Sequence, residues 1–258
     1  MPAVIFDCDG VLADTERDGH LPAFNAAFAE AGVPISWSED EYAEKVTIGG
    51  GKERIASVLT PALDTTIGLH SAEERTTWIK QLHQAKTRHF TDRVAAGLLP
   101  ARPGIHRLVA DALAAGWSVA VASTSAEPSV RAVLRHAVGD ASYSQVRVFA
   151  GDIVAAKKPA PDIYLTVLAD VGLDPAECVV VEDSGIGVAA AVAAGLTTLV
   201  TVSTFTADDD FTGAGLILTD LGDPGAPATV IDAPAGIVPG DVVTLDDLTA
   251  LIAKETTP

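Results

Sequence analysis

The sequence predicts an α/β fold, a doubly wound parallel sheet of the Rossmann-like type with an all-helical domain inserted after the first strand. Short runs of almost wholly apolar residues recur along the chain, which is typical of parallel strands buried on both faces. Helical patterns separate several of these runs, and alternating strands and helices predict one sheet with right-handed crossovers. Residues 15–95 break this alternation, because they contain helical patterns and no convincing buried strand.

The predicted strands are the apolar runs, in order Ala3–Phe6, Ser118–Ala122, Val146–Phe149, Cys178–Val181, Thr198–Val202 and Leu216–Leu218. Between them the patterns HRLVADALAAGW, PDIYLTVLADVG and GIGVAAAVAAG indicate helices, two of them closed by a Gly that suits a C-cap. The Pro- and Gly-rich stretch GDPGAPATVIDAPAGIVPGD is expected to be a loop before a last helix at LDDLTALIA.

The inserted segment contains three helical stretches, LPAFNAAFAEAG, KERIASVL and AEERTTWIKQLHQAKTRHF. After it, the Pro and Gly residues of LLPARPG mark the return to the α/β pattern. We therefore expect a core domain of residues 1–14 and 96–258 and an all-helical domain of residues 15–95, with the two chain crossings acting as a hinge.

Composition argues against several classes of function. The chain has 35 acidic and 17 basic residues and a net charge of -18, which disfavours sequence-independent binding to nucleic acid or to an anionic membrane. No apolar run approaches the ~20 residues of a membrane span, and Asp7 interrupts the region that a signal peptide would need. We expect a cytoplasmic monomer, with Cys8 and Cys178 as reduced thiols in the core.

Polar residues collect where four of the predicted strands end. In an open parallel sheet the reactive site lies outside the carboxyl ends of the strands, so these residues should meet at one rim. They are, strand by strand, Asp7 and Asp9, then Ser123, Thr124 and Ser125, then Lys157 and Lys158, and finally Glu182 and Asp183.

This collection suits a divalent cation and a phosphoryl group. Carboxylates from two strands are oxygen ligands of the kind that Mg²⁺ prefers, while hydroxyl and ammonium groups can bind the phosphoryl oxygens. Asp7 could attack phosphorus as a nucleophile. Asp9 could protonate the leaving alcohol and later take a proton from water, which divides a slow hydrolysis into two easier steps.

Four motifs, DCDGVLADTE, STS, KKPAPD and VVVEDSGIG, together resemble those of the haloacid dehalogenase superfamily of phosphotransferases, in the same order and strand context. The helical insertion resembles the superfamily's helical-cap class, which includes phosphoglycolate phosphatases and β-phosphoglucomutases. The stretches DTERDGH, TIGGGKERI, LHQAKT, LLPARPG, FAGDIV and TADDDF are similar to those of CbbY-like sugar phosphatases, whose characterised members dephosphorylate xylulose 1,5-bisphosphate. The resemblance extends from Val4 to about Pro224.

The resemblance implies roles for the four acids of the rim. Asp7 would be the nucleophile and a metal ligand, and Asp9 the general acid and base, with its backbone carbonyl on the metal. Asp183 would be a third ligand. Glu182 would either bind the metal or hold a water molecule coordinated to it.

The hydroxyls and lysines of the rim are assigned in the same way. Ser123 would bind the transferring phosphoryl group, with Thr124 and Ser125 beside the substrate. Lys158, which directly precedes a proline, would pair with the phosphoryl group and with Asp7. The neighbouring Lys157 would then face solvent, although the sequence alone does not separate the two lysines.

Substrate choice is expected to lie in the inserted helical domain, the cap. Glu16 and His20, just after the first crossing, could reach the sugar, although His20 could equally be a surface or core histidine. His83 and Lys86 lie three residues apart and share a helix face, which could be a substrate-binding face or merely a solvated one.

A glycine-rich turn in the cap is the candidate site for a second phosphate. Gly49, Gly50 and Gly51 could expose backbone N–H groups ahead of a helix whose first turn carries Lys52 and Arg54. The alternative is that this turn is simply a flexible helix entry.

Other functions fit the motifs less well. GIGVAA matches a dinucleotide-binding pattern, but the two acids directly before it would repel a pyrophosphate, and its glycines suit close packing. GGGKER has Glu53 where a Walker motif needs Ser or Thr. A non-catalytic scaffold would not need a rim of mutually repelling acids, and a dehalogenase needs neither the Asp9 acid nor a metal.

The sequence therefore predicts a Mg²⁺-dependent sugar-phosphate phosphatase that acts through a phospho-aspartyl intermediate on a small phosphorylated sugar. A bisphosphate such as xylulose 1,5-bisphosphate is the expected substrate. The alternative is a phosphosugar mutase of the β-phosphoglucomutase type, which uses the same residues but returns the phosphoryl group to a sugar.

Overall fold

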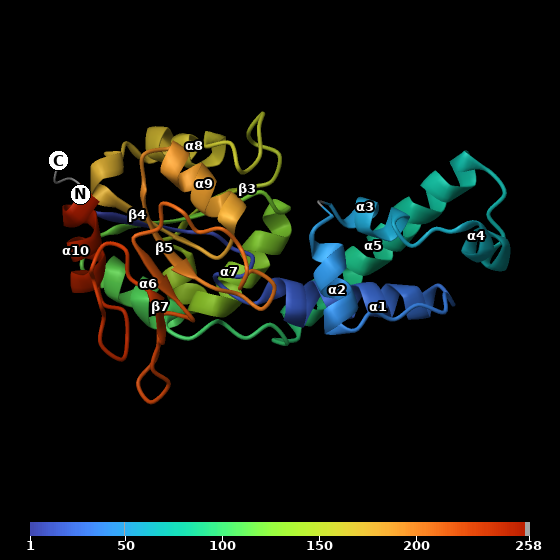
Figure 1. The fold of residues 1–258 in the computed structure, drawn as a ribbon, viewed down its shortest axis with the longest axis horizontal. Helices are drawn as coiled ribbons and strands as arrows, with labels where there is room; N and C mark the ends of the chain where they lie inside the picture. Colours follow the sequence, from blue (N-terminus) through green and yellow to red (C-terminus); the bar gives the residue numbers. More distant parts are fainter. Residues whose placement is uncertain (49, 256–258) are drawn as a thin grey trace. The chain divides into compact units, whose positions relative to one another are not determined.

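The computed structural model describes residues 1–48 and 50–255, and these residues form two units (Figure 1). One unit is the α/β core, which comprises Met1–Asp14 and the chain from Pro100 onward. The other is the cap, Thr15–Leu99, which consists of helices and the turns between them. Gly49, one of the predicted site residues, lies outside the described residues.

Within the described residues, the core contains a seven-stranded sheet with the strand order β3-β2-β1-β4-β5-β6-β7. All neighbouring strands are parallel except β6 and β7. The chain adds β2 and β3 on one side of β1 and then β4 and β5 on the other, which confirms the predicted doubly wound sheet. The strands are β1 (Ala3–Phe6), β2 (Ser118–Ser123), β3 (Arg147–Ala150), β4 (Cys178–Glu182), β5 (Thr197–Thr201), β6 (Leu216–Leu218) and β7 (Val230–Asp232).

Strand β7 corrects the prediction that the Pro- and Gly-rich tail is all loop. Its three residues pair antiparallel with β6 at the edge of the sheet, with a register shift between Ile217 and Leu218. Val230 is only half-buried, and the next two residues are exposed. An edge strand held by backbone hydrogen bonds carries no buried apolar run, so the hydropathy pattern gives no signal for it.

Helices cover both faces of the sheet (Figure 1). The buried residues of α8 and α9 form one apolar cluster with alternate residues of β1, β2 and β4, whereas α6 packs against α7 and α10 on the opposite face. Burial on both faces explains why the central strands are apolar at most positions, since each fully buried Val or Ile contributes about 1.5–3 kcal/mol. The helices are α6 (Ile105–Ala114), α7 (Glu127–Tyr143), α8 (Asp162–Val171), α9 (Gly185–Ala193) and α10 (Leu245–Glu255), with a short 3₁₀ turn η2 (Pro175–Glu177).

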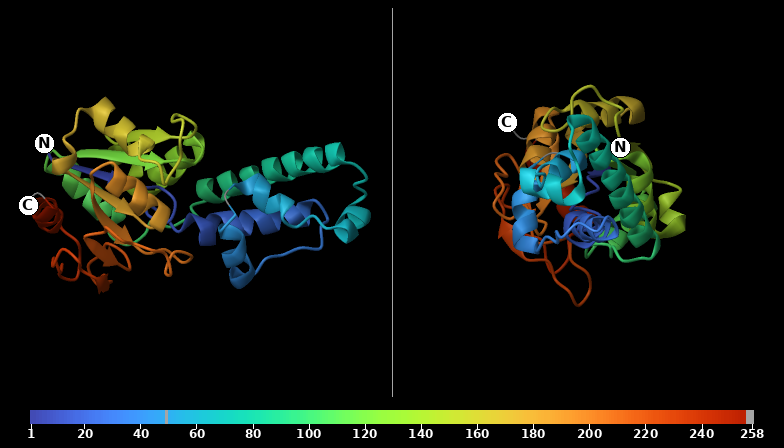
Figure 2. Two further views of the ribbon diagram at one scale, coloured as in Figure 1. Left: turned by 45° about the horizontal axis from the view of Figure 1, so that its top comes forward. Right: turned by 90° about the vertical axis from the view of Figure 1, so that its right-hand side faces the viewer.

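The cap is organised around the long helix α5 and the shorter helix α1, and Figure 2 shows the two lying alongside each other. Its apolar core includes an aromatic cluster of Phe24, Phe28, Trp37 and Tyr42, with ring centroids 4.9–6.5 Å apart. The helices are η1 (Glu16–His20, a π-helical turn), α1 (Leu21–Glu30), α2 (Glu39–Val46), α3 (Gly51–Ala56), α4 (Pro61–Ile67) and α5 (Ala72–Ala95).

Cys8 and Cys178 are buried free thiols, as expected. Among residues 1–48 and 50–255, no helix combines the length and the apolar character that a bilayer crossing requires.

Candidate active site

The turn after β1 brings Asp7 next to β4. The Asp7 amide donates a hydrogen bond to the Val181 carbonyl at 2.9 Å, which extends the parallel ladder by one residue and leaves the Asp7 side chain buried. The chain then turns at Gly10, whose φ of +81° favours glycine. A Cβ at Gly10 would overlap the Asp183 carboxylate, so this glycine permits the close approach of the two strand ends.

Asp7, Glu182 and Asp183 form a compact group of buried acids, each offering a carboxylate oxygen within 4.8 Å of the others. Burial raises the pKa of Asp7 to about 7, against the opposing charge of Lys158. Burial is the main cause that raises the pKa of Asp183 well above its usual range, and the negative charges of Glu182 and Asp7 raise it further. Three mutually repelling carboxylates with hard oxygen donors fit a divalent cation, which would compensate their charge.

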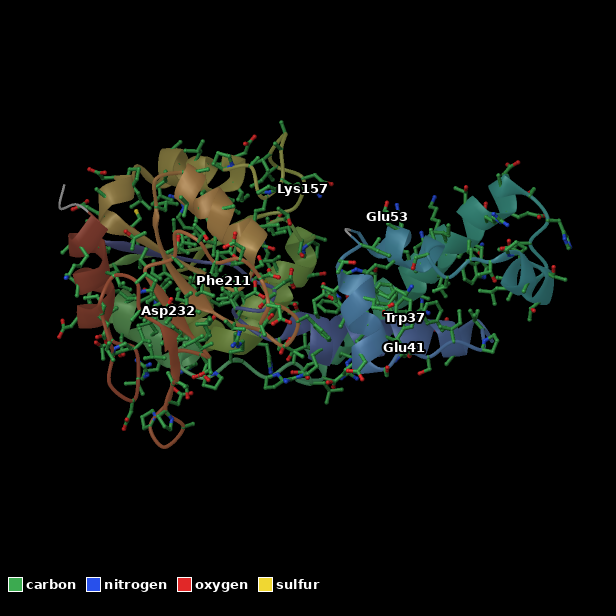
Figure 3. All side chains as sticks on the ribbon, viewed as in Figure 1. Trp37, Glu41, Glu53, Lys157, Phe211 and Asp232 are labelled. Carbon is green, nitrogen blue, oxygen red and sulfur yellow. The ribbon has the colours of Figure 1, made fainter. Side chains whose placement is uncertain are left out.

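Lys158 is the counter-ion of this group. Its ammonium donates to Asp7 Oδ1, to Glu182 Oε1 at 2.6 Å and to the Ala122 carbonyl at 3.3 Å, and its side chain is only 7% exposed. The structure thereby distinguishes the two neighbouring lysines: Lys158 is buried and pairs with Asp7, whereas Lys157 is exposed. Lys157 projects from the loop after β3 into solvent, where it pairs with Asp152 at 2.8 Å (Figure 3).

Glu182 is wholly buried and its two oxygens are already engaged. Oε1 accepts hydrogen bonds from Lys158 and from the Tyr164 hydroxyl, and Oε2 accepts one from the Asp183 amide at 3.2 Å. A Cβ at Gly187 would overlap this carboxylate, which agrees with the interpretation of the GIG glycines as residues for close packing. Both Glu182 oxygens therefore have hydrogen-bond partners within the protein, and whether Glu182 binds the metal or a water molecule coordinated to it stays a prediction.

Three hydroxyl residues lie at the carboxyl end of β2: Ser123 is its last residue, and Thr124 and Ser125 follow it. Ser123 is buried, and its Oγ accepts a hydrogen bond from the Ser125 amide at 3.1 Å. The Ser125 hydroxyl donates to the carboxylate of Asp9, which is only partly buried, while Thr124 is half-buried. Ser125 thus contacts the candidate acid and base directly.

Two residues of the site were not found from the sequence. Tyr164 occupies an apolar position of a predicted helix. Its hydroxyl could have indicated a role, because a buried tyrosine hydroxyl requires a hydrogen-bond partner. Arg102 belongs to LLPARPG, which the sequence marks as a domain boundary and as a CbbY-like stretch without assigning a role to this arginine. Its guanidinium donates to four backbone carbonyls: that of Gly10 in the turn after β1, those of Thr201 and Val202 at the end of β5, and that of Thr219 just after β6.

In the cap, Glu16 is held by a buried network. Its carboxylate accepts two hydrogen bonds from Arg54, at 2.8 and 3.0 Å, and one from the Tyr42 hydroxyl at 2.6 Å. Burial opposes ionisation of Glu16, but the charges of His20 and Arg54 and these hydrogen bonds outweigh it and lower its pKa to about 2. Arg54 also donates to the Ile48 carbonyl at 2.9 Å. Its predicted contact with a substrate phosphate stays a prediction.

A second polar group in the cap contains His20 and Lys86. The Lys86 ammonium lies 2.8 Å from His20 Nδ1 and over the rings of Phe24 and Phe90, at 4.9 and 5.3 Å from their centroids. His20 stacks on Phe90 with a centroid distance of 4.3 Å. Lys86 is therefore largely buried and does not lie on the solvated face that was the alternative.

The glycine turn lies next to His83. A Cβ at Gly51 would come within 2.9 Å of the His83 ring, and Gly50 has a φ of +99°. Partial burial is the main cause that lowers the pKa of His83, and the positive charges of Lys86 and Lys52 lower it further. Lys52 is exposed, so this part of the cap offers a cation and an imidazole near one another.

The core is an open parallel sheet with acids, a lysine and hydroxyls at its carboxyl rim, and a helical domain is inserted after its first strand. This combination of fold and site is typical of hydrolases that transfer a phosphoryl group to water. Comparison with known proteins identifies the family. The sequence profile of the haloacid dehalogenase-like hydrolases matches residues 1–195, and the chain belongs to this family. It is a phosphatase of the haloacid dehalogenase type.

The chain is similar to CbbY proteins over most of its length. It is 45% identical to protein CbbY of Cupriavidus necator over 228 residues, which are 88% of each protein. It is also 45% identical to a CBBY-like protein of Arabidopsis thaliana over 86% of this chain and 70% of that protein. A crystal structure of a CbbY variant from Rhodobacter sphaeroides in complex with xylulose-(1,5)bisphosphate superimposes with a TM-score of 0.70 at 38% identity, covering 85% of this chain and 95% of the other.

Proposed function

We propose that the protein is a Mg²⁺-dependent phosphatase that hydrolyses a small phosphorylated sugar through a phospho-aspartyl intermediate. A bisphosphate such as xylulose 1,5-bisphosphate is the proposed substrate. The observation that carries the proposal is the buried group of Asp7, Glu182 and Asp183 with Lys158 as its counter-ion. The similarity to a CbbY protein that binds xylulose-(1,5)bisphosphate supports the choice of substrate.

In the first step, a carboxylate oxygen of Asp7 attacks phosphorus and the bond from phosphorus to the sugar oxygen breaks. Because Lys158 occupies Oδ1, we assign the attack to Oδ2. The Ser123 hydroxyl binds a phosphoryl oxygen, and the positive charge of Lys158, whose three N–H donors stay on protein acceptors, offsets the negative charge that develops on the phosphoryl group. Asp9 supplies the proton that the departing sugar oxygen requires.

In the second step, Asp9 takes a proton from water, and the resulting hydroxide oxygen attacks the phosphorus of phospho-Asp7. Phosphate leaves and the Asp7 carboxylate is restored, so protons and bonds balance over the cycle. Asp7, Asp183 and the backbone carbonyl of Asp9 would hold the Mg²⁺, whose positive charge would offset that of the phosphoryl group. The contact of Ser125 with Asp9 supports a role in orienting the acid.

In the cap, we assign recognition of the sugar to Glu16 and His20, and binding of the second phosphate to Lys52, with His83 and Lys86 beside it. A short helix of six residues follows the glycine turn, so side-chain charge rather than the helix end is expected to bind the anion. Arg54 contributes indirectly, because its ion pair holds the Glu16 carboxylate in place.

The test is a phosphate-release screen over sugar mono- and bisphosphates, with Mg²⁺ and with excess EDTA. We expect release that depends on Mg²⁺ and is fastest with a bisphosphate. Formation of an isomeric sugar phosphate without free phosphate would instead identify a mutase. Absence of turnover with every ester, in the presence of Mg²⁺, would overturn the proposal.

A further inference from the structure

Tyr164 lies in the first turn of α8, and its side chain is completely buried in the apolar cluster between α8, α9 and the sheet. The packing fixes the ring, so the hydroxyl has one defined direction. It points to Glu182 and donates a hydrogen bond to Oε1. This is the oxygen that also accepts the hydrogen bond from Lys158.

The same tyrosine contacts Lys158 by a second route. The Lys158 ammonium lies over the Tyr164 ring, 5.1 Å from its centroid, in the arrangement of a cation–π interaction. One side chain therefore touches both the lysine and the carboxylate that competes for it. Neither contact involves the substrate directly.

The geometry of Lys158 makes this contact matter. An ammonium has three N–H donors, and those of Lys158 are directed to Asp7, Glu182 and the Ala122 carbonyl. Asp7 and Glu182 are thus rival acceptors for one cation. A second donor on Glu182 Oε1 reduces the negative charge that this oxygen presents to Lys158, which leaves the lysine available to Asp7.

We propose that Tyr164 is a positioning residue for the first chemical step. It acts through Glu182 and Lys158 to keep the ammonium on Asp7 Oδ1, so that the other oxygen of Asp7 faces phosphorus. This inference rests on the proposed role of Asp7 as the nucleophile. It concerns the reaction at phosphorus and is independent of which sugar the enzyme accepts.

The test uses Tyr164→Phe in the full-length protein with Mg²⁺, and p-nitrophenyl phosphate as the substrate. The variant keeps the ring, its packing and the cation–π contact, and it removes only the hydroxyl. We expect kcat and the rate of phospho-enzyme formation to fall about tenfold, the scale of one hydrogen bond to a charged group, with KM unchanged.

Two control variants separate positioning from general effects. Tyr143→Phe makes the same chemical change on α7, away from the acid group, and should leave kcat unchanged. Ile163→Val removes one methylene from the same apolar cluster, so it reports what a loss of stability alone does to kcat. A fall in kcat for Tyr164→Phe that exceeds the effect of Ile163→Val at matched Tm supports positioning.

A double-mutant cycle with Glu182→Gln then tests the route. If Tyr164 acts through Glu182, the tyrosine change should have little further effect in the Glu182→Gln background. Equal effects in both backgrounds, an unchanged kcat, or a loss that lies wholly in KM would overturn the inference while the phosphatase proposal stands. A parent enzyme that releases no phosphate from this ester or from any sugar phosphate would overturn both.

Discussion

At the scale of single residues, the two acids of the opening motif differ in their partners. Asp7 is buried against Lys158, whereas Asp9 is partly exposed and accepts a hydrogen bond from the Ser125 hydroxyl. Burial raises the pKa of Asp7, but the charge of Lys158 opposes this rise and so favours the ionised form that a nucleophile needs, whereas the partly exposed Asp9 carboxylate can be reached by water. The contacts therefore support different roles for two residues that are nearly adjacent in the sequence.

This difference leads to a prediction about Asp7→Asn and Asp9→Asn. Asp7→Asn should form no phospho-enzyme, because the attacking oxygen is lost. Asp9→Asn should still be phosphorylated by p-nitrophenyl phosphate, whose leaving group needs no proton, and should lose at least about a hundredfold in turnover of a sugar phosphate. Intact-mass measurement after rapid acid quenching reports the intermediate. Phosphorylation of the Asp7→Asn protein on this motif would contradict the assignment.

Glu16 predicts a dependence of stability on pH. Its pKa is lowered from 4.5 to about 2, so it stabilises the fold above pH 4.5 and loses this contribution as the pH falls toward 2. At about 1.4 kcal/mol per pKa unit, and with the side chain 25% exposed, about 1–3 kcal/mol is expected. In Glu16→Gln this contribution is absent.

Urea unfolding of the parent and of Glu16→Gln between pH 3 and pH 7 measures this contribution of Glu16 to the free energy of unfolding. The difference in the free energy of unfolding should be largest above pH 5 and should shrink toward pH 3. Glu44→Gln, which removes an exposed acid from the same cap, serves as the control and should show no such trend. A constant difference for Glu16→Gln across this range would show that the ion pair does not stabilise the cap.

At the scale of elements, the sequence predicts best what hydrophobic burial determines. The central strands are found within one or two residues because both of their faces are buried, whereas β7 was missed because it has no buried face. The acids and Ser123 were predicted because strand ends of a parallel sheet converge. Contacts made by long side chains cannot be predicted in this way, since the fold must first place both partners.

The cap illustrates this limit. Sequence spacing groups Lys52 with Arg54 as cations of one turn, but the structure directs Arg54 inward to Glu16 and leaves Lys52 exposed. The π-helical turn η1 was also not predicted, because one extra residue per turn leaves no hydropathy signal. Turns of this kind occur frequently at functional sites.

Lys52 and Arg54 should therefore behave differently when replaced by Ala. Lys52→Ala should reduce kcat/KM for the bisphosphate by about tenfold to a hundredfold and leave p-nitrophenyl phosphate hydrolysis unchanged, since only the bisphosphate has a second phosphate to bind. Arg54→Ala should lower the free energy of unfolding by about 1.5–3 kcal/mol, because it leaves Glu16 without its cation.

Steady-state kinetics on both esters, together with urea unfolding, distinguish the two cases. Lys80→Ala removes an exposed cation from α5 and is the matched control for net charge. Should Lys52→Ala impair both substrates equally, the glycine turn would be needed for folding or for movement of the cap and not for binding a second phosphate.

At the scale of the whole molecule, the acid group connects metal binding to folding. The core unit brings buried carboxylates from β1 and β4 together, and Arg102 ties the returning chain to the turn after β1 and to the ends of β5 and β6. Without a cation, the repulsion among these acids opposes folding. A ligand that binds only the folded state stabilises it, so Mg²⁺ is expected to stabilise the whole α/β unit and not only to activate the reaction.

Asp183→Asn tests this connection between metal and fold. Removing one of the mutually repelling charges should raise the Tm of the EDTA-treated protein by a few degrees, because about 1 kcal/mol shifts the Tm by roughly 2–4 °C in a protein of this size. The same change removes a ligand, so the increase in Tm that Mg²⁺ produces in the parent should largely disappear, and phosphate release should fall with it. Asp208→Asn, which neutralises an exposed acid, should leave both the Tm and its response to Mg²⁺ unchanged. Thermal unfolding at several Mg²⁺ concentrations gives the Tm of the parent and of both variants. If the Tm of Asp183→Asn rose with Mg²⁺ as strongly as that of the parent, the metal would bind elsewhere.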